Sequence, residues 1–280
     1  MMPRKHPPAK PADYKSGVKP VWCPGCGDFG VLAALSRAFH HMGLAREEIA
    51  VISGIGCSGR LPAYLKTYGF HGLHGRALPV AQGLKIARPE LTVIAAGGDG
   101  DMYSIGAGHF IHACRRNVDI TAIIMDNRVY GMTKGQPSPT TEPDVVTAMQ
   151  PEGTGLPPLN GMLLALSANA GFVARGFSGD PNGLAELIEA AIRHPGFAVL
   201  EVLSPCPTFR PEQTAWKHQV QKGALTPAAT LHEAMEQVLR TPQLSTGIVW
   251  RDEGRAAAPV MSGAAAADHV LEEIHAGFRP

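Results

Sequence analysis

The most informative stretch of the chain is residues 92–116, TVIAAGGDGDMYSIGAGHFIHACRR. A short apolar run leads into glycines, and the glycines lead into a helical pattern. Glycines let the backbone approach a ligand closely, and the free N–H groups that open a helix attract anions. No Gly-Lys-Ser/Thr ending follows, and Tyr103 stands where a dinucleotide-binding loop needs its third glycine. The stretch therefore predicts a strand–turn–helix unit with an anion site of a different kind from these nucleotide loops.

Strand-like and helix-like segments alternate on both sides of this stretch. The predicted strands are 49–53, 92–96, 120–125, 171–175 and 197–203, and the predicted helices are 29–43, 78–88, 104–116, 159–170 and 181–194. Near-continuous apolar strands between helices are typical of an α/β fold whose mostly parallel sheet carries helices on both faces. We therefore expect ligands at the carboxyl ends of the strands.

The outer parts of the chain carry fewer signals. We divide the chain into an N-terminal arm, residues 1–20, an α/β domain, residues 21–210, and a C-terminal extension, residues 211–280. Segment 131–158 is rich in Pro, Gly and Thr without periodicity, which in a loop of this length indicates function or disorder. Residues 264–276 fit a helix, but the extension holds no chemical motif.

Composition argues against several classes of function. The chain has 280 residues, 45% of them apolar, and a formal net charge of +1. A nucleic-acid partner is not indicated, because it requires a basic face. No window holds 18 consecutive apolar residues, and the polar N-terminus lacks the apolar core of a secretory signal. We therefore expect a cytoplasmic protein that neither spans a membrane nor binds nucleic acid.

Two polar residues follow neighbouring predicted strands. Asp99 lies between two glycines after the strand at 92–96, and Asn127 follows the strand at 120–125. Oxygen ligands at one sheet edge suit a hard cation such as Mg²⁺, which can bridge to a diphosphate. The alternative is a glycine-rich turn in which the aspartate only caps a helix.

The five cysteines are Cys23, Cys26, Cys57, Cys114 and Cys206. An odd number without a secretion signal argues against a disulfide framework. The close pair Cys23-Pro-Gly-Cys26 fits a zinc knuckle, a redox pair or an iron–sulfur ligand pair. Cys57 and Cys206 follow predicted strands, at the same edge of the sheet as Asp99 and Asn127, where they could complete a four-thiolate site. The alternative is that they are buried small hydrophobic residues. Cys114 lies within a predicted helix, where we interpret it as a core thiol.

The flanking motifs add a family resemblance. Gly98-Asp99-Gly100 with Asn127 resembles the thiamine diphosphate motif. Residues 22–30 (WCPGCGDFG), 71–83 (HGLHGRALPVAQG), 98–121 and 126–141 resemble the beta subunits of 2-oxoacid:ferredoxin oxidoreductases, a likeness covering roughly residues 20–220.

This resemblance implies a thiamine diphosphate-binding fold and a reaction. The expected reaction is oxidative decarboxylation of a 2-oxoacid, best 2-oxoglutarate, with coenzyme A taking the acyl group and ferredoxin the electrons, or the reverse. An alpha subunit is expected to hold the pyrimidine half of thiamine, in a dimer of alpha–beta pairs. The alternatives are another 2-oxoacid such as pyruvate or a branched-chain acid, a non-redox thiamine enzyme, and a zinc-stabilised binding module.

The resemblance also assigns residues. It implies Mg²⁺ on Asp99, Asn127 and the Val129 carbonyl, and one [4Fe–4S] cluster on Cys23, Cys26, Cys57 and Cys206. His74 and Arg76 are the catalytic candidates, for contact with the thiazolium or a substrate carboxylate. The expected cofactor-binding residues are Gly56, Cys57, Ser58, His74, Gly98, Asp99, Gly100, Asp101, Asn127, Val129, Tyr130, Gly131, Met132 and Thr133. Further candidates near the site are Arg60, Lys134, Gln136, Ser138 and Thr140.

Overall fold

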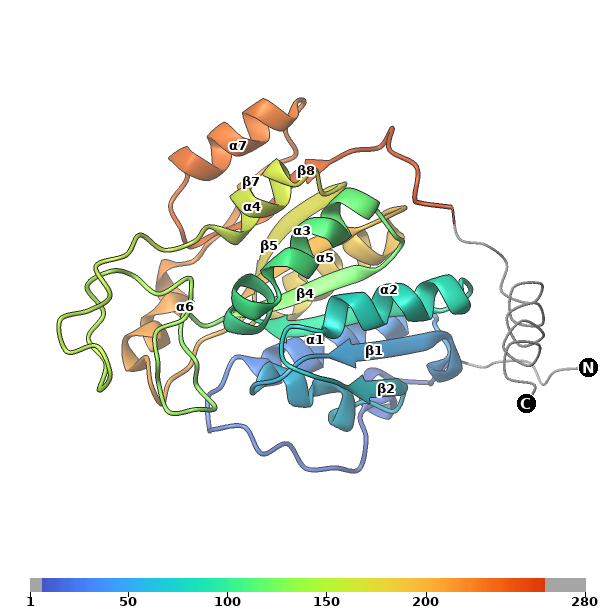
Figure 1. Cartoon of the computed structure of the whole chain (residues 1–280). Helices are drawn as coiled ribbons and strands as arrows, with labels where there is room; N and C mark the ends of the chain where they lie inside the picture. Colours follow the sequence, from blue (N-terminus) through green and yellow to red (C-terminus); the bar gives the residue numbers. More distant parts are fainter. Residues whose placement is uncertain (1–6, 260–280) are drawn as a thin grey trace, which may run out of the picture.

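The computed structural model describes residues 7–259, which build one eight-stranded sheet of order β2-β1-β3-β4-β6-β5-β8-β7 (Figure 1). The strands are β1 (Ile49–Ser53), β2 (Tyr68–His71), β3 (Thr92–Gly98), β4 (Thr121–Asp126), β5 (Phe172–Phe177), β6 (Ala198–Leu203), β7 (Gln221–Leu225) and β8 (Ser245–Arg251). Strands β1 to β6 are parallel, whereas β8 pairs antiparallel with β5, and β7 runs parallel to β8.

Helices cover both faces of this sheet (Figure 1). On one face lie α1 (Asp28–His41) and α5 (Pro181–Arg193); on the other lie α2 (Ala77–Ala87), α3 (Ala107–Arg116), α4 (Gly161–Ser167) and α7 (Leu231–Arg240). Short α6 (Trp216–Gln219) lies beyond β6, and a π-helical turn, Asp101–Ile105, precedes α3. Short 3-10 helices span Pro11–Tyr14, Arg46–Glu48, Ser58–Tyr64 and Pro211–Ala215.

Burial on both faces explains the apolar strand sequences. Successive side chains of a strand point to opposite faces, so Ile49 and Val51 enter the core under α1, while Ala50 and Ile52 enter the core under α2. All five residues of β1 are buried, as are all six of β4 and of β6. The predicted α/β fold with helices on both faces of a mostly parallel sheet is confirmed.

The sequence prediction missed three strands, β2, β7 and β8, and two helices, α6 and α7, as well as the short 3-10 helices. Strand β2 is a four-residue edge strand whose residues are all exposed, so it lacks an apolar run. Residues 211–259 were assigned to an extension, yet β7 and β8 continue the main sheet. Segment 131–158 holds isolated bridges but neither helix nor strand, as predicted. The helix expected at 264–276 lies outside the described residues.

The parallel pairing decides where ligands can bind. Strands β1, β3, β4 and β6 are consecutive neighbours in the sheet, and Gly98 pairs with Met125 while Asp126 pairs with Leu203. The loops that follow these four strands therefore meet at one edge. Among residues 7–259, no helix is long and apolar enough to cross a membrane.

Candidate functional site

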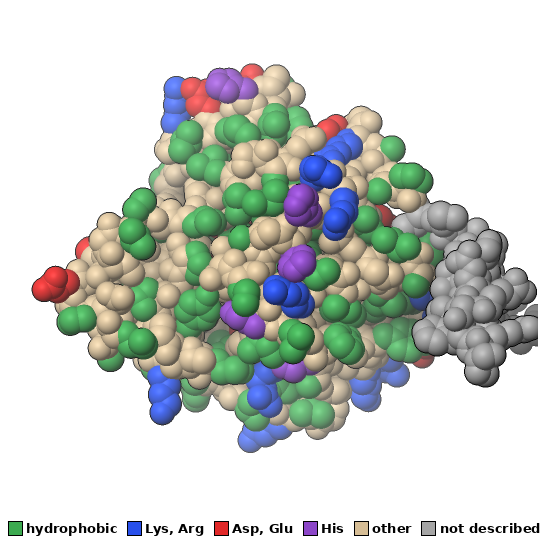
Figure 2. Space-filling model, viewed as in Figure 1, with side chains coloured by type: hydrophobic (Ala, Val, Ile, Leu, Met, Phe, Trp, Pro, Cys, Tyr) green, Lys and Arg blue, Asp and Glu red, His purple; other side chains and the backbone are tan. Residues whose placement is uncertain are grey.

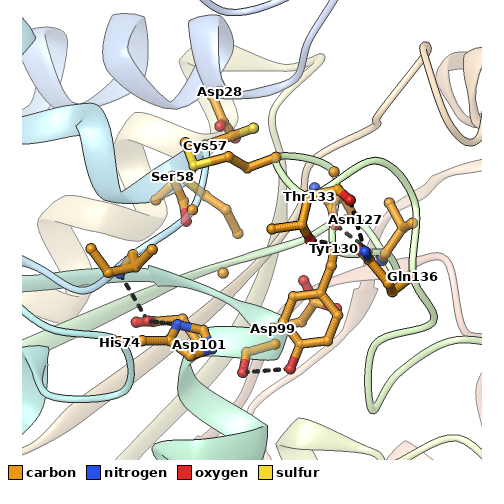
Figure 3. Close-up of a pocket in the computed structure, with 18 residues that line it drawn as sticks. Asp28, Cys57, Ser58, His74, Asp99, Asp101, Asn127, Tyr130, Thr133 and Gln136 are labelled. Atoms are coloured by element: carbon orange, nitrogen blue, oxygen red, sulfur yellow. Dashed lines mark hydrogen bonds and ion pairs between the residues drawn. The ribbon is translucent and has the colours of Figure 1, made fainter.

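A cavity of about 510 Å³ opens at this edge (Figure 3). All fourteen residues expected to bind cofactor line it, and they come from the loops after β1, β3 and β4 and from the turn before α2. Four further residues complete the wall: Asp28, Ile55, Met125 and Gln136. The structure thus brings the predicted residues together, while the binding of a cofactor by them stays a prediction.

Asp101 organises one wall of the cavity. Its buried Oδ1 accepts hydrogen bonds from the backbone N–H groups of Ile55 (2.9 Å) and Gly75 (2.8 Å). The same oxygen lies 2.8 Å from Nδ1 of His74. One carboxylate therefore fixes the loop after β1, the turn before α2 and the imidazole. Asp101 shapes the site more than it offers a free ligand.

His74 presents one ring nitrogen for chemistry. Because the Asp101 carboxylate can only accept, the hydrogen of the neutral ring lies on Nδ1. Nε2 is then the nitrogen with a free lone pair, on a side chain that is 36% exposed and lines the cavity. The His74–Asp101 pair can accept a proton or a hydrogen bond from a bound molecule.

Asp99 lies at the floor of the cavity with a second carboxylate nearby. The Thr140 hydroxyl is 2.8 Å from Oδ2 of Asp99 and 2.8 Å from Oδ1 of Asp126. Burial, reinforced by the charge of Asp99, raises the pKa of Asp126 to about 8. A neutral Asp126 can donate to Thr140 while Thr140 donates to Asp99. Burial raises the pKa of Asp99 as well, while hydrogen bonds from Ser138 and Thr140 lower it, so the two carboxylates crowd one buried site.

The loop after β4, which carries Asn127, is held in an uncommon conformation. Arg128, between the two expected ligands Asn127 and Val129, has a φ of 56°, in the left-handed region that disfavours side chains other than Gly and Asn. Oδ1 of Asn127 accepts from the Val129 N–H at 3.1 Å. This strained turn sets the Asn127 side chain and the Val129 carbonyl on one short loop.

Glycine is required at position 100. A Cβ there would stand 2.2 Å from the ring of Tyr130, whose hydroxyl donates to the Gly100 carbonyl at 3.2 Å. The second glycine of the Gly-Asp-Gly motif therefore makes room for an aromatic ring from the neighbouring loop.

Three cysteine-bearing loops meet beside the cavity. The Gly27 N–H donates to the Pro205 carbonyl at 3.0 Å, and Nε1 of Trp22 donates to the Cys57 carbonyl at 2.8 Å. A Cβ on Gly131 would lie 3.3 Å from Sγ of Cys206 and 4.0 Å from Sγ of Cys57, so both sulfurs point at the same backbone.

Cys57 and Cys206 lie within electrostatic reach of each other and of both Cys23 and Cys26, whereas Cys114, a residue of α3, is buried in the core. Within residues 7–259, no three His, Cys, Asp or Glu side chains close around a single metal ion.

A buried carboxylate adjoins these thiols. Asp28, at the first position of α1, accepts from the Ser204 hydroxyl at 2.8 Å and lies with Cys57 on one side of the cavity (Figure 3). Burial raises the pKa of Asp28 to about 6. Burial, with the Asp28 charge adding to it, raises the pKa of the Cys57 thiol to about 11 and that of Cys26 further.

The two arginine candidates, Arg60 and Arg76, lie around the cavity rather than in its wall. Nη1 of Arg76 donates to the carbonyls of Gly75 and Ile105, and Nε of Arg60 donates to the Tyr64 hydroxyl. Neither arginine lines the cavity. Their roles stay predictions.

Sequence reasoning missed Asp28 as a site residue. A signal was present, since it follows Cys26 by two positions, but a polar residue opening a helix is ordinarily read as a cap.

Comparisons with known proteins give the relatives of this chain. Residues 54–202 match the family model described as thiamine pyrophosphate enzyme, C-terminal TPP binding domain. The chain is 49% identical over 208 residues to 2-oxoglutarate oxidoreductase subunit KorB of Mycobacterium tuberculosis, covering 74% of this chain and 56% of that protein. It is 49% identical over 197 residues to 2-oxoacid:ferredoxin oxidoreductase 2, subunit beta, of Aeropyrum pernix, covering 70% of this chain and 64% of that protein. The chain thus spans less than two thirds of these two relatives.

Two further relatives are matched over more of their length. 2-Oxoglutarate synthase subunit KorB of Archaeoglobus fulgidus is 46% identical, with 72% of this chain and 76% of that protein covered. A solved 2-oxoglutarate:ferredoxin oxidoreductase from Magnetococcus marinus, with 2-oxoglutarate, coenzyme A and succinyl-CoA bound, aligns with a TM-score of 0.85 and 40% identity. That alignment covers 99% of this chain and 98% of the solved one.

The thiol pKa values give a test in protein prepared without iron. Because the pKa of Cys57 is raised, its reactive thiolate is scarce near neutral pH. We expect its alkylation by iodoacetamide to increase roughly tenfold per pH unit between about pH 8 and 10, as the thiolate fraction does. Exposed Cys23 serves as the internal control and reacts first at about pH 8. Peptide mass spectrometry measures both rates, and equal rates at about pH 8 contradict the assignment.

Proposed function

Because the chain belongs to the beta subunits of the 2-oxoacid:ferredoxin oxidoreductases, we propose that it binds thiamine diphosphate, Mg²⁺ and one [4Fe–4S] cluster for the oxidative decarboxylation of a 2-oxoacid or its reverse. The observation that carries this proposal is the meeting of the Gly-Asp-Gly loop, the Asn127 loop and three cysteine loops around one cavity. The family model that covers residues 54–202 supports the thiamine part.

The residues around Asp99 fit a magnesium diphosphate. Asp99 is buried, its carboxylate accepts a hydrogen bond from Thr140, and no salt bridge among residues 7–259 involves it. A bound cation would supply the missing positive charge. Asp99, the Asn127 side chain and the Val129 carbonyl would hold the ion, since all three are oxygen ligands that Mg²⁺ prefers. The largely apolar cavity above them is of a size that suits an organic cofactor.

The cysteine loops fit an iron–sulfur cluster. Such a cluster is bound from outside, one thiolate to each iron, so its ligands stand farther apart than those of a single ion. Cys23, Cys26, Cys57 and Cys206 would hold it, beside the cavity wall that Cys57 itself helps to form. When bound, thiamine would supply the electron sink for decarboxylation, and the cluster would supply an electron acceptor on the way to ferredoxin.

The protein side chains have separate tasks in this reaction. Asp101 orients His74, and Nε2 of His74 can hold a proton or hydrogen-bond an oxygen of the 2-oxoacid. The Tyr130 ring, fixed against Gly100, closes the floor above Asp99. Arg76, at the rim beside Ile105, is the proposed contact for a substrate carboxylate, since its planar guanidinium suits two oxygens.

An open apolar rim supports the proposed alpha subunit. Ile55 and Met132 line the cavity and are 38% and 44% exposed, while Leu73 and Ile105 beside it are 74% and 54% exposed. Figure 2 shows further hydrophobic side chains among Lys, Arg and His over α2 and α3. Contiguous apolar surface around a binding site usually marks an interface. We propose that an alpha subunit covers this rim, in a dimer of alpha–beta pairs in the cytoplasm.

The substrate proposal is 2-oxoglutarate. The relatives from Mycobacterium tuberculosis and Archaeoglobus fulgidus carry 2-oxoglutarate in their names, and the solved structure was determined with that acid bound. Pyruvate or branched-chain 2-oxoacids are the second candidates, because the Aeropyrum pernix relative is named for 2-oxoacids in general.

Asp99→Asn tests the metal site. The variant keeps the side-chain shape but loses the charge that faces the cation. We expect thiamine diphosphate to bind roughly a hundredfold to several thousandfold more weakly in the presence of Mg²⁺, since removing one partner of a buried charge interaction costs about 3–5 kcal/mol. Calorimetry on the anaerobic complex with its partner measures the affinity, and iron content is the control that stays constant. Unchanged affinity would show that Asp99 is not a ligand.

Cys206→Ala tests the cluster and Cys114→Ala is its matched control. Both residues are buried, but only Cys206 lies with the other cysteine loops. We expect the Cys206 variant to lose most of its iron and its brown colour, and the Cys114 variant to keep both. Iron and sulfide analysis of the two purified proteins decides the matter. Full iron in the Cys206 variant removes it from the ligand set.

Activity assays with and without the partner test the whole proposal. The chain supplies the diphosphate half of the thiamine site, and an open rim remains. We therefore expect no oxidation of any 2-oxoacid by the chain alone, and turnover with coenzyme A and ferredoxin once the alpha subunit is present. A panel of 2-oxoacids ranks the substrates, with 2-oxoglutarate expected to show the highest kcat/KM. Turnover by the chain alone contradicts the need for a partner.

A further inference from the structure

We propose that Gln213 is a positioning residue that joins the metal loop to the cluster loop and thereby tunes both cofactors. The inference rests on the function proposed above. Its observation is one side-chain amide between two backbones: Nε2 of Gln213 donates to the Asn127 carbonyl at 2.8 Å, and the Cys206 N–H donates to Oε1 of Gln213 at 2.8 Å. No motif or spacing in the amino-acid sequence singles out this glutamine.

The bridge takes over where the sheet ends. Strands β4 and β6 pair up to Asp126 and Leu203, and one further bond joins the Ser204 N–H to the Asp126 carbonyl at 2.9 Å. Asn127 then follows β4, and Pro205 follows Ser204 after β6. Proline has no N–H to donate. Gln213 supplies the missing donor to Asn127 and an acceptor for the next N–H group, that of Cys206.

The chemistry of the bridge favours glutamine over other residues. It needs a donor and an acceptor on one planar group, and the two backbone partners fix which end is which. The side chain is 1% exposed, so water does not replace either bond. A closed turn holds it in place, because Arg210 N–H donates to the Cys206 carbonyl at 2.8 Å and Gln213 N–H donates to the Arg210 carbonyl at 3.0 Å.

Each half of the bridge acts on a different cofactor. On one side, the bond fixes the backbone of Asn127, whose side chain is an expected Mg²⁺ ligand. On the other side, it occupies the Cys206 N–H, which otherwise could donate to sulfur. Hydrogen bonds to the sulfurs are among the factors that set the reduction potential of an iron–sulfur cluster. They stabilise the reduced form, which carries more negative charge, and so they raise the potential. Gln213 therefore keeps the metal loop in place and the cluster potential low.

Gln213→Leu removes both hydrogen bonds of the side-chain amide and keeps a side chain of similar size. In the anaerobic complex with the alpha subunit, we expect Mg²⁺-dependent thiamine diphosphate affinity to fall roughly tenfold to a hundredfold, as for other residues that support a metal ligand. We also expect the cluster's midpoint potential to rise. Calorimetry and redox titration followed by electron paramagnetic resonance measure the two effects. Gln219→Leu, an exposed neighbour on α6, is the control and changes neither.

Gln213→Glu separates the two halves. Its carboxylate keeps the acceptor for Cys206 but places an oxygen against the Asn127 carbonyl. We expect thiamine affinity to fall as in the Leu variant while the midpoint potential stays at or below that of the wild type. This variant also decides the matter if the Leu variant fails to assemble.

Two outcomes overturn different claims. If the wild-type complex binds both cofactors and the Gln213 variants change only thermal stability, Gln213 is merely structural and the inference fails. If the wild-type complex itself holds neither a cluster nor thiamine diphosphate, the proposed function fails first.

Discussion

The parallel pairing of β3, β4 and β6 is the constraint on which the rest of the structure depends. It brings Gly98 beside Met125 and Asp126 beside Leu203, so the Gly-Asp-Gly loop, the Asn127 loop and the Cys206 loop start from neighbouring strands. Consecutive parallel strands are joined by long crossover connections, and ligands bind where these connections begin, outside the carboxyl ends of the strands. The site therefore gathers residues from 28 to 136 of the chain, and Cys206 beside them, without strain in the sheet.

Crowded carboxylates are the main electrostatic cost of this arrangement, and each is compensated differently. Asp101 accepts from two backbone N–H groups and lies against His74. Glu201, 1% exposed on β6, pairs with Arg175 at 2.7 Å and accepts from the Tyr103 hydroxyl at 3.0 Å. A raised pKa lets Asp126 go uncharged at neutral pH. Asp99 and Asp28 are buried beside the cavity without a cationic partner among the described residues. A cation bound at Asp99, as proposed above, would offset that charge.

How much the sequence predicted depended on the range of the interactions involved. The central strands and helices were predictable because burial on both faces leaves an apolar run that is visible locally. The fourteen cavity residues were predictable because they follow strands or carry a familiar motif. Strand β8 was not, because its burial comes from antiparallel pairing with β5, some seventy residues earlier. Gln213 was missed because its partners Asn127 and Cys206 are distant in sequence, so no local pattern records the contact.

The long loop 131–158 shows why an irregular segment can be as constrained as a strand. Arg128 costs free energy by adopting a left-handed backbone, roughly 1–2 kcal/mol for a residue with a side chain. The loop offsets that cost: Thr141 donates to the Arg128 carbonyl at 2.7 Å, and Glu142 pairs with the guanidinium of Arg128 and, at 2.9 Å, with that of Arg210. Arg210 in turn donates to the Arg128 carbonyl at 3.0 Å, and the Arg128 guanidinium lies over the Trp216 ring. Because Arg210 belongs to the turn that carries Cys206 and Gln213, the long loop braces the metal loop and the cluster loop together. A segment without periodicity in sequence is therefore ordered here by its contacts with the site.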